Sequence, residues 1–301
     1  MRRLPFTVHR LPALFLVALA SSADDYQATR EELVEKINAV RKTASVAPLR
    51  LSALLSGVAQ KRADEIAAGG DIHDSTARED SRRAKEAGYE PRLISEFAAT
   101  ADGDLAEVVA TWTRDEGVPA QELAGADYRE IGVGASFKDT PLYVVLLAMP
   151  WDDFFREKTA PFADLERMRK EMLARVNRER TARGLAPLRR HPRLDDTAQA
   201  HANDMFRRRY YSHDTPEGKS AMDRIQAGGY RARYAGENIA RGQYSVDEVM
   251  DGWMESKTHR DHLLSPIFDD VGFGLSFGKN PGGHEIIWVQ NFGRPKGRER
   301  L

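Results

Sequence analysis

Apolar side chains recur at helical spacing along the chain, and this pattern predicts its helices. Between residues 163 and 183 the apolar positions fall three or four residues apart, which is typical of an amphipathic helix with one buried face. Two further helices are predicted over 195–208 and 246–259. Ser245 precedes the last of these in the position of an N-cap, with Glu248 three residues further on.

Shorter apolar and β-branched runs predict strands. They cover 142–149 in the first half of the chain and 271–277 and 285–292 in the second. The segment Lys-Asn-Pro-Gly-Gly at 279–283 has the composition of a turn. Helices before and between antiparallel strands predict an α+β fold in which helices cover a central sheet.

The two halves of the chain repeat one another. Each contains an apolar helix followed by the loop Ala-Pro-Leu-Arg, at 47–50 and at 186–189. Further matches follow in the same order at offsets of 139 to 141 residues, among them Trp112 with Trp253, which we expect to be core residues. An ordered series at a nearly constant offset indicates a tandem duplication.

The repeat sets the expected domain boundaries. In chain order we expect a signal peptide (1–23), a diverged first domain (26–150), a connector with aromatic residues (151–163), a second domain (164–294) and a tail (295–301).

The N-terminus has the three-part pattern of a secretory signal. Three arginines flank or precede an apolar run at 11–20 that is too short to span a bilayer, and Ala-Leu-Ala at 18–20 offers a cleavage site. We therefore expect a secreted or periplasmic protein whose mature chain begins near Ser21 and does not span a membrane.

Composition narrows the function. Hydrophobic residues make up 41% of the chain and charged residues 30%, as in globular proteins, and the net charge of −1 does not favour nucleic acid as a partner. Cysteine is absent, which excludes disulfides and thiol chemistry and suits a bacterial envelope protein.

The motifs of the second half resemble those of the CAP superfamily (SCP, or cysteine-rich secretory protein, antigen 5 and pathogenesis-related-1), in its cysteine-free bacterial form. The matching pieces are LARVNRERTARGLAPL, AQAHANDM, YSHDTPEG, AGENIA, VMDGWMESKTHRDHLL, VGFGLSF and IIWVQNFG. The first half looks like a diverged copy. The resemblance implies two tandem α-β-α sandwich domains and a cleft lined by two histidines and two acidic residues, which in some members bind a divalent metal.

Carried over by motif, the two histidines of that cleft fall on His213 and His259, and one acidic residue falls on Glu237. The other acidic position lands on Ser256, with Glu255 one place away, which departs from the family pattern. His213, Glu237 and His259 are thus the candidate ligands of a metal such as zinc, and imidazole and carboxylate groups also act as general acids and bases.

Helical spacing supports part of this set. Ser256 and Glu255 lie three and four residues before His259, so one continuous helix would present them on the same face as the imidazole. Alternatively, each histidine only bridges local structure through hydrogen bonds. We expect His201 to be a surface or hydrogen-bonded histidine and His262 to lie at the surface.

The first copy keeps His73 and Glu96, but Val118 stands in place of the second cleft imidazole and Pro119 would cut the helix short. The first domain is therefore expected to be structural or partner-binding.

Three functions remain open. The protein is a non-catalytic binding module for a small ligand, lipid or envelope component, a metal-assisted hydrolase acting on peptide or cell-wall material, or a structural platform. The pattern disfavours serine hydrolysis, because nothing marks an oxyanion hole beside Ser256.

Overall fold

The computed structural model describes residues 23–101, 104–114, 118–138 and 140–297. The predicted signal peptide lies almost entirely outside these residues. The chain divides into two compact units, Met1–Pro150 and Trp151–Leu301. Among the described helices, none is both long and apolar enough to cross a membrane.

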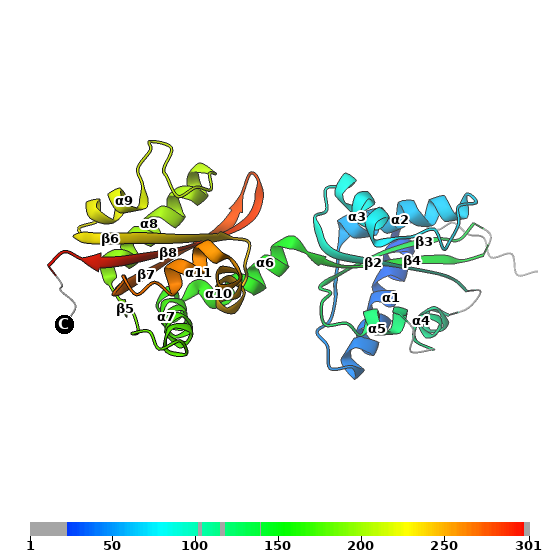
Figure 1. Ribbon diagram of the computed structural model, residues 1–301. Helices are drawn as coiled ribbons and strands as arrows, with labels where there is room; N and C mark the ends of the chain where they lie inside the picture. Colours follow the sequence, from blue (N-terminus) through cyan, green and yellow to red (C-terminus); the bar gives the residue numbers. More distant parts are fainter. Residues whose placement is uncertain (1–22, 102–103, 115–117, 139, 298–301) are drawn as a thin grey trace, which may run out of the picture. The chain divides into compact units, whose positions relative to one another are not determined.

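The first unit is a four-stranded sheet between two layers of helices, in the strand order β1-β3-β4-β2 (Figure 1). Its elements are α1 (Ala23–Thr43), β1 (Arg50–Leu51), α2 (Ala53–Ala67), α3 (Ala77–Glu86), β2 (Pro91–Thr100), α4 (Leu105–Thr113), α5 (Val118–Leu123), β3 (Glu130–Ser136) and β4 (Leu142–Pro150).

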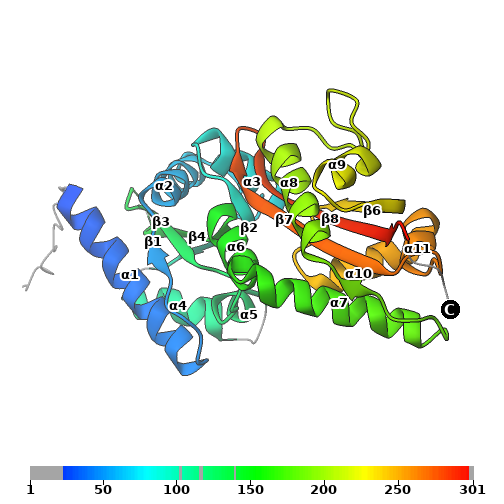
Figure 2. The ribbon, with the colours of Figure 1, turned by 90° about the vertical axis from the view of Figure 1, so that its left-hand side faces the viewer.

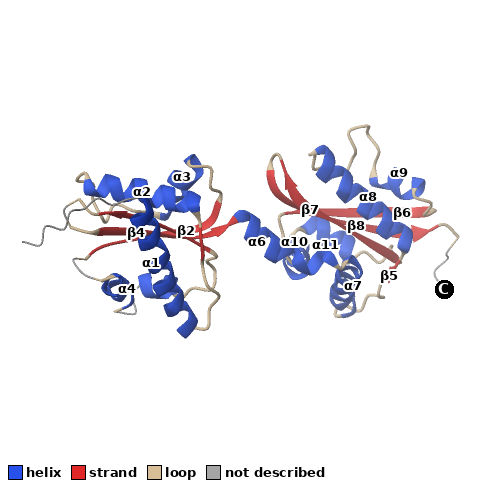
Figure 3. Cartoon of the chain, turned by 180° about the vertical axis from the view of Figure 1, so that it is seen from behind, coloured by secondary structure: helices blue, strands red, loops and turns tan. Residues whose placement is uncertain are grey.

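The second unit repeats this plan with the order β5-β7-β8-β6 (Figure 3). Its elements are α6 (Trp151–Thr159), a 3-10 helix η1 (Ala160–Ala163), α7 (Leu165–Thr181), β5 (Arg189–Arg190), α8 (Pro192–Arg208), α9 (Ala221–Ala227), β6 (Ala232–Arg241), α10 (Val246–Glu255), α11 (Lys257–Leu263), β7 (Asp270–Asn280) and β8 (Gly283–Pro295).

Each central strand is buried on both faces, which explains its unbroken apolar sequence. In β8, Ile286, Trp288 and Phe292 pack with residues of α7 and α10, whereas Ile287 and Val289 pack with residues of α8. Figure 2 shows α7 and α10 on one side of the sheet and α8 on the other. Successive side chains of a strand point to opposite faces, so one strand contributes to two cores. The unit is therefore an α-β-α sandwich.

Paired glycines let one helix lie directly on the sheet. A Cβ atom at Gly272 would lie 2.2 Å from the carbonyl carbon of Leu194, and one at Gly274 would lie 2.3 Å from that of Ala198. The Gly-x-Gly pattern of β7 thus reflects the close approach of α8.

One buried arginine in each unit ties distant segments together. Arg41 Nη1 donates to the carbonyl of Leu123 at 2.8 Å, and Arg180 Nη1 donates to the carbonyl of Leu263 at the same distance. The duplication therefore extends to individual hydrogen bonds.

The segment expected to be a connector forms α6 and η1 and packs on the second unit. The Phe155 ring lies 4.8 Å from that of His284, and the Phe154 ring lies 5.4 Å from that of Tyr244. Its aromatic residues are explained by this packing.

The helix predicted over 246–259 is interrupted, and this part of the prediction is wrong. Ser245 does cap its start, since its hydroxyl accepts from the backbone N–H of Glu248. Ser256, however, has an extended backbone (φ −78°, ψ 121°), so α10 ends at Glu255 and α11 begins at Lys257. The sequence does not mark the break, because neither glycine nor proline stands between Trp253 and Arg260.

Candidate ligand site at the edge of the second sheet

The candidate site lies at β6, the edge strand of the second sheet. Adjacent residues of this strand face different layers: Glu237 points toward α8 and α9, and Asn238 points toward α11. Both side chains are buried, with exposed fractions of 4% for Glu237 and 0% for Asn238. Strand alternation therefore lets two consecutive polar residues hold opposite layers.

Both carboxylate oxygens of Glu237 are engaged. Oε1 lies 2.9 Å from His213 Nδ1, and Oε2 accepts from Arg224 Nη2 at 2.6 Å. His213 and Glu237, two of the three candidate ligands, are thus in direct contact. The guanidinium compensates the buried negative charge, which a carboxylate in this position requires.

His213 is the exposed member of the pair, since 53% of its side chain is accessible while Glu237 is almost fully covered. Arg224 Nη1 also donates to the carbonyl of His213 at 2.6 Å, which ties down the loop backbone. If Nδ1 carries the proton toward the carboxylate, Nε2 is left as an acceptor for a ligand.

Asn291 of β8 completes the surroundings of the carboxylate. The hydrogen bonds around its side-chain amide assign the orientation of that amide. In this orientation the amide nitrogen donates to Glu237 Oε2 at 3.1 Å, and the amide oxygen accepts from Ala198 N at 3.1 Å. Glu237 is thus held from three segments besides its own strand: the loop before α9, α9 itself and β8.

His201 lies behind this pair and is not a surface residue. It is 1% exposed, its Nε2 lies 3.0 Å from the carbonyl of Ser212 and 3.9 Å from Glu237 Oε1, and its Nδ1 has no hydrogen-bond partner in the described structure. Burial lowers the pKa of His201, so its imidazole is neutral at pH 7. Of the two alternatives expected for His201, the structure shows the hydrogen-bonded one, through Nε2 alone.

On the other face, Asn238 anchors α11. Its Nδ2 donates to the carbonyl of His259 at 3.1 Å, and its Oδ1 lies 2.9 Å from His262 Nδ1. His262 is half-buried against Phe268 and Phe292, so the prediction that it lies at the surface is wrong. The sequence signal for the position of His262 was the Asn of the Gly-Glu-Asn motif, because a buried amide needs hydrogen-bond partners.

The histidines on either side of the edge strand influence one another. Burial lowers the pKa of His259, and repulsion from His213 and then His262 lowers it further. The pKa of His262 is lowered by burial and then by His213. Both imidazoles are therefore neutral at pH 7, and His213 lies within electrostatic range of each.

Glu255 and Ser256 do not join the site through helical spacing. Because α10 ends at Glu255, this residue and His259 belong to different helices. Glu255 is exposed, its backbone carbonyl accepts from Arg260 Nη1 at 3.3 Å, and the Ser256 hydroxyl makes no capping bond with α11. The argument that placed these side chains on the face of His259 is wrong.

The site does not fit a metal ion as it is arranged. Within the described residues, no group of three histidine, cysteine or acidic side chains is disposed to hold one. Glu237 is the carboxylate nearest to His213, and both its oxygens already accept hydrogen bonds, one of them from a cation. A divalent ion would have to displace Arg224 from this carboxylate.

In the first unit an arginine fills the corresponding interior. Arg62, at the position of His201, donates from Nε to Glu96 Oε1 at 3.0 Å and from Nη2 to the carbonyls of Asp71 and Asp74. His73 is exposed. The side chain of Val118 lies outside the described part of the chain.

A cavity of about 540 Å³ lies between α8, α9 and the intervening loop, and two partners of Glu237 reach it. His201 and Arg224 line it, together with Thr215. The polar network around the carboxylate therefore borders space large enough for a small ligand.

Comparison with known proteins gives the family. A model described as "Cysteine-rich secretory protein family" (CAP) matches residues 34–148 and 173–292, more than half of the chain. The uncharacterized protein YkwD of Bacillus subtilis (strain 168) is 35% identical over 123 residues, which are 41% of this chain and 46% of that protein. The chain spans less than half the length of the curated relatives it matches.

Among solved structures, an extracellular protein containing a SCP domain from Bacillus anthracis str. Ames is 25% identical, covers 52% of each chain and has a TM-score of 0.37. An outer surface protein from Borrelia burgdorferi is 23% identical, with a TM-score of 0.38, over 42% of this chain and 92% of that chain. The two family-model matches confirm the predicted tandem α+β architecture. The chain belongs to the CAP, or cysteine-rich secretory protein, family.

Proposed function

We propose that this chain is an exported bacterial CAP-domain protein whose second domain binds a cell-envelope component through His213, Glu237 and His259. The main support for this proposal is the 2.9 Å contact between His213 Nδ1 and Glu237 Oε1, which joins a half-exposed imidazole to a buried carboxylate. A side chain oriented from beneath while its other nitrogen faces outward is suited to recognise a ligand.

The surrounding groups favour an uncharged, hydroxyl-rich ligand such as a cell-wall glycan. The charge of Glu237 is compensated by Arg224, and the lowered pKa values of His259 and His262 leave both imidazoles neutral at pH 7. A neutral imidazole offers one N–H donor and one acceptor nitrogen, which matches a hydroxyl that donates and accepts. The same groups are poor partners for a lipid tail.

Metal-assisted hydrolysis is a second candidate because of one feature, although an ion would have to displace Arg224 from Glu237. A metal-ligating histidine usually donates its other ring N–H to a carboxylate, and His213 faces Glu237 in that way. Calorimetric titration with Zn²⁺ tests this candidate: stoichiometric binding that His213→Gln removes supports it, and no binding excludes a zinc-dependent site at His213.

The first domain is proposed to be a structural or partner-binding copy. Arg62 holds Glu96 and two loop carbonyls, so the counterpart of the His213 site is filled by a permanent ion pair. This assignment supplies the matched control for the binding test.

Cosedimentation with isolated peptidoglycan tests the binding proposal. We expect the full chain to sediment with it, and His213→Gln and His259→Gln to remain in the supernatant. His73→Gln, the equivalent change in the first domain, should bind as the unaltered protein does. Equal binding by all four proteins, or no binding by any, contradicts the proposal.

Export has its own test. N-terminal sequencing of the protein recovered from its producing cell should begin near Ser21. An intact Met1 in protein from the cytoplasm would contradict export without bearing on the site.

A further inference from the structure

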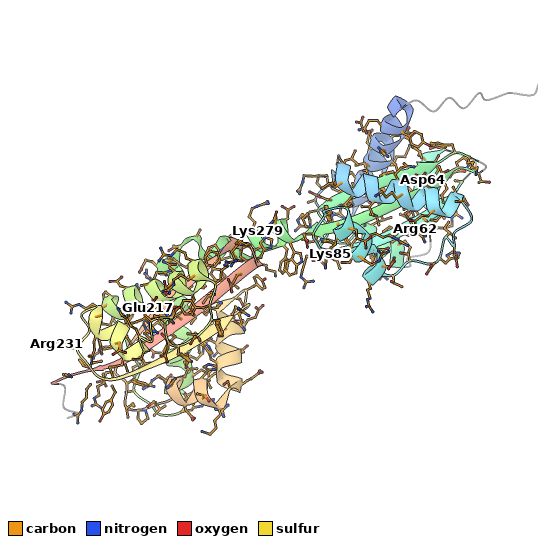
Figure 4. All side chains as sticks on the ribbon, turned by 90° about the horizontal axis from the view of Figure 1, so that it is seen from above. Arg62, Asp64, Lys85, Glu217, Arg231 and Lys279 are labelled. Carbon is orange, nitrogen blue, oxygen red and sulfur yellow. The ribbon has the colours of Figure 1, made fainter. Side chains whose placement is uncertain are left out.

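A second, strongly basic pocket lies in the second unit, where β5, the start of α8 and the end of β8 meet. It has a volume of about 610 Å³. Arg231, one of its lining residues, lies at the opposite end of this unit from Lys279 (Figure 4). The pocket shares no residue with the His213 site. Its charged lining residues are Arg189, Arg190, Arg193, Arg231, Lys296 and Asp270.

Two of the five cations belong to the structure of the unit. Arg189 Nη2 lies 3.1 Å from Asp270 Oδ1, the single carboxylate of the lining. Arg190 is held by Asp195 at 2.6 Å and by Glu166 at 2.7 Å. Neither arginine has its charge available for a ligand without breaking an ion pair.

The other three cations are not compensated. Arg193, Arg231 and Lys296 are exposed, and in the described part of the chain none forms an ion pair with a carboxylate. Arg193 Nη1 donates to the carbonyl of Gly229, which fixes it across the turn between α9 and β6. Three positive charges in one concave site are unexpected in a chain whose net charge is −1, because exposed cations of such a chain are normally interspersed with anions.

The duplicated first unit shows that the fold does not require these charges. It keeps the structural ion pair, since Arg50 Nη2 lies 3.0 Å from Glu130 Oε1, as Arg189 lies beside Asp270 in the second unit. At the repeat offsets of 139 and 141 residues, however, Leu54 stands in place of Arg193 and Glu90 in place of Arg231. The extra cations are thus specific to the second unit.

The start of α8 adds to the positive potential. His191 caps this helix, and its Nδ1 accepts from the backbone N–H of Arg193 at 3.2 Å. The N-terminal end of a 17-residue helix carries a partial positive charge that favours an anion. Helix, guanidinium and ammonium groups therefore act together on the same space.

From this arrangement we propose that the pocket binds a phosphate-bearing ligand. A phosphate group offers several oxygens and up to two negative charges, which guanidinium groups meet with paired N–H donors and an ammonium group meets as a point charge. The phosphate source in an envelope is either a soluble phosphorylated molecule or a lipid headgroup, and both present the same chemistry to Arg193, Arg231 and Lys296.

Binding of inorganic pyrophosphate to the full chain, measured by calorimetry, tests the proposal at low ionic strength. Cosedimentation with phosphatidylcholine vesicles containing phosphatidylglycerol tests the lipid source in parallel. We expect Arg231→Glu, which installs the residue of the first unit, to weaken binding roughly tenfold or more. Arg231→Lys should retain most of the affinity, and added salt should weaken it.

Arg233→Glu is the matched control. Arg233 is exposed, lies two residues from Arg231 and does not line the pocket, so its substitution makes the same change of charge outside the pocket. Its affinity should stay within about twofold of the unaltered chain. If Arg231→Glu loses pyrophosphate binding and Arg233→Glu keeps it, the ligand is a soluble phosphorylated molecule. If Arg231→Glu loses vesicle binding and Arg233→Glu keeps it, the ligand is a lipid headgroup. Failure to bind either probe, or equal loss in both variants, overturns the proposal.

Discussion

Arg62 Nε donates to Glu96 Oε1 across 3.0 Å, and both side chains are almost completely buried in the first unit. In the second unit the equivalent carboxylate, Glu237, instead has the neutral His201 behind it and takes its compensating charge from Arg224. The duplicated domains therefore enclose the same acidic residue in different ways, with a filled interior in one copy and an imidazole-lined one in the other.

Replacing Arg62 tests the structural role of the first copy. Arg62→Met should lower the free energy of unfolding of that unit by about 3 kcal/mol, because it removes the 3.0 Å ion pair of the buried Glu96 and leaves only Arg83, whose Nη1 lies 3.8 Å from Oε2. Hydrogen exchange of the β2 amides in the full chain measures this loss. Arg82→Met removes an exposed arginine of the same unit and should change little. Equal protection of β2 in both variants contradicts the assigned role.

The buried histidines make the second unit sensitive to acid. The pKa of His201 is lowered in the folded state, so between about 6.5 and that lowered value the unfolded chain binds more protons. The stabilisation from a neutral His201 is thus present above about pH 6.5 and is lost as the pH falls. His259 and His262 act in the same direction.

Thermal unfolding of the full chain between about pH 7.5 and pH 5 measures this effect. The transition of the second unit should move to lower temperature on acidification, and His201→Asn should reduce that movement. A pH dependence that this substitution leaves unchanged assigns the sensitivity to other groups.

The sequence predicted the sandwich, because the repeated motifs and their resemblance to a known family fix which segments lie together. The same motifs placed His213 and Glu237 in one cleft without showing how the two side chains meet. They did not predict Arg224 as the partner of Glu237, since nothing in the spacing shows which cation compensates a buried carboxylate. Placing His262 at the surface failed for a related reason. Its orientation depends on the buried Asn238 amide, which only the folded strand brings to α11.

Replacing two glycines of the second unit by alanine should change its stability in opposite directions. Gly272→Ala should destabilise this unit by about 1–3 kcal/mol, because its Cβ would overlap the backbone of α8 at Leu194. Gly252→Ala, within α10, meets nothing within 4 Å and should stabilise by about 0.5–1 kcal/mol through helix propensity. Calorimetric unfolding of both variants checks the signs, and a stable Gly272→Ala protein would show that α8 can move away from β7.

Glu237→Gln tests whether the carboxylate compensates Arg224 as well as orienting His213. The substitution leaves a guanidinium that is 12% exposed without its counter-charge, and it should cost about 3 kcal/mol in the stability of the second unit. Adding Arg224→Met removes the stranded charge, so the double variant should recover part of that loss although it lacks both partners. Glu217→Gln, at an exposed carboxylate paired with Arg208, is the matched control and should change stability by less than about 1 kcal/mol. Additive losses in the double variant would show that Arg224 and Glu237 do not depend on one another, and the orientation of His213 would then have to come from the loop alone.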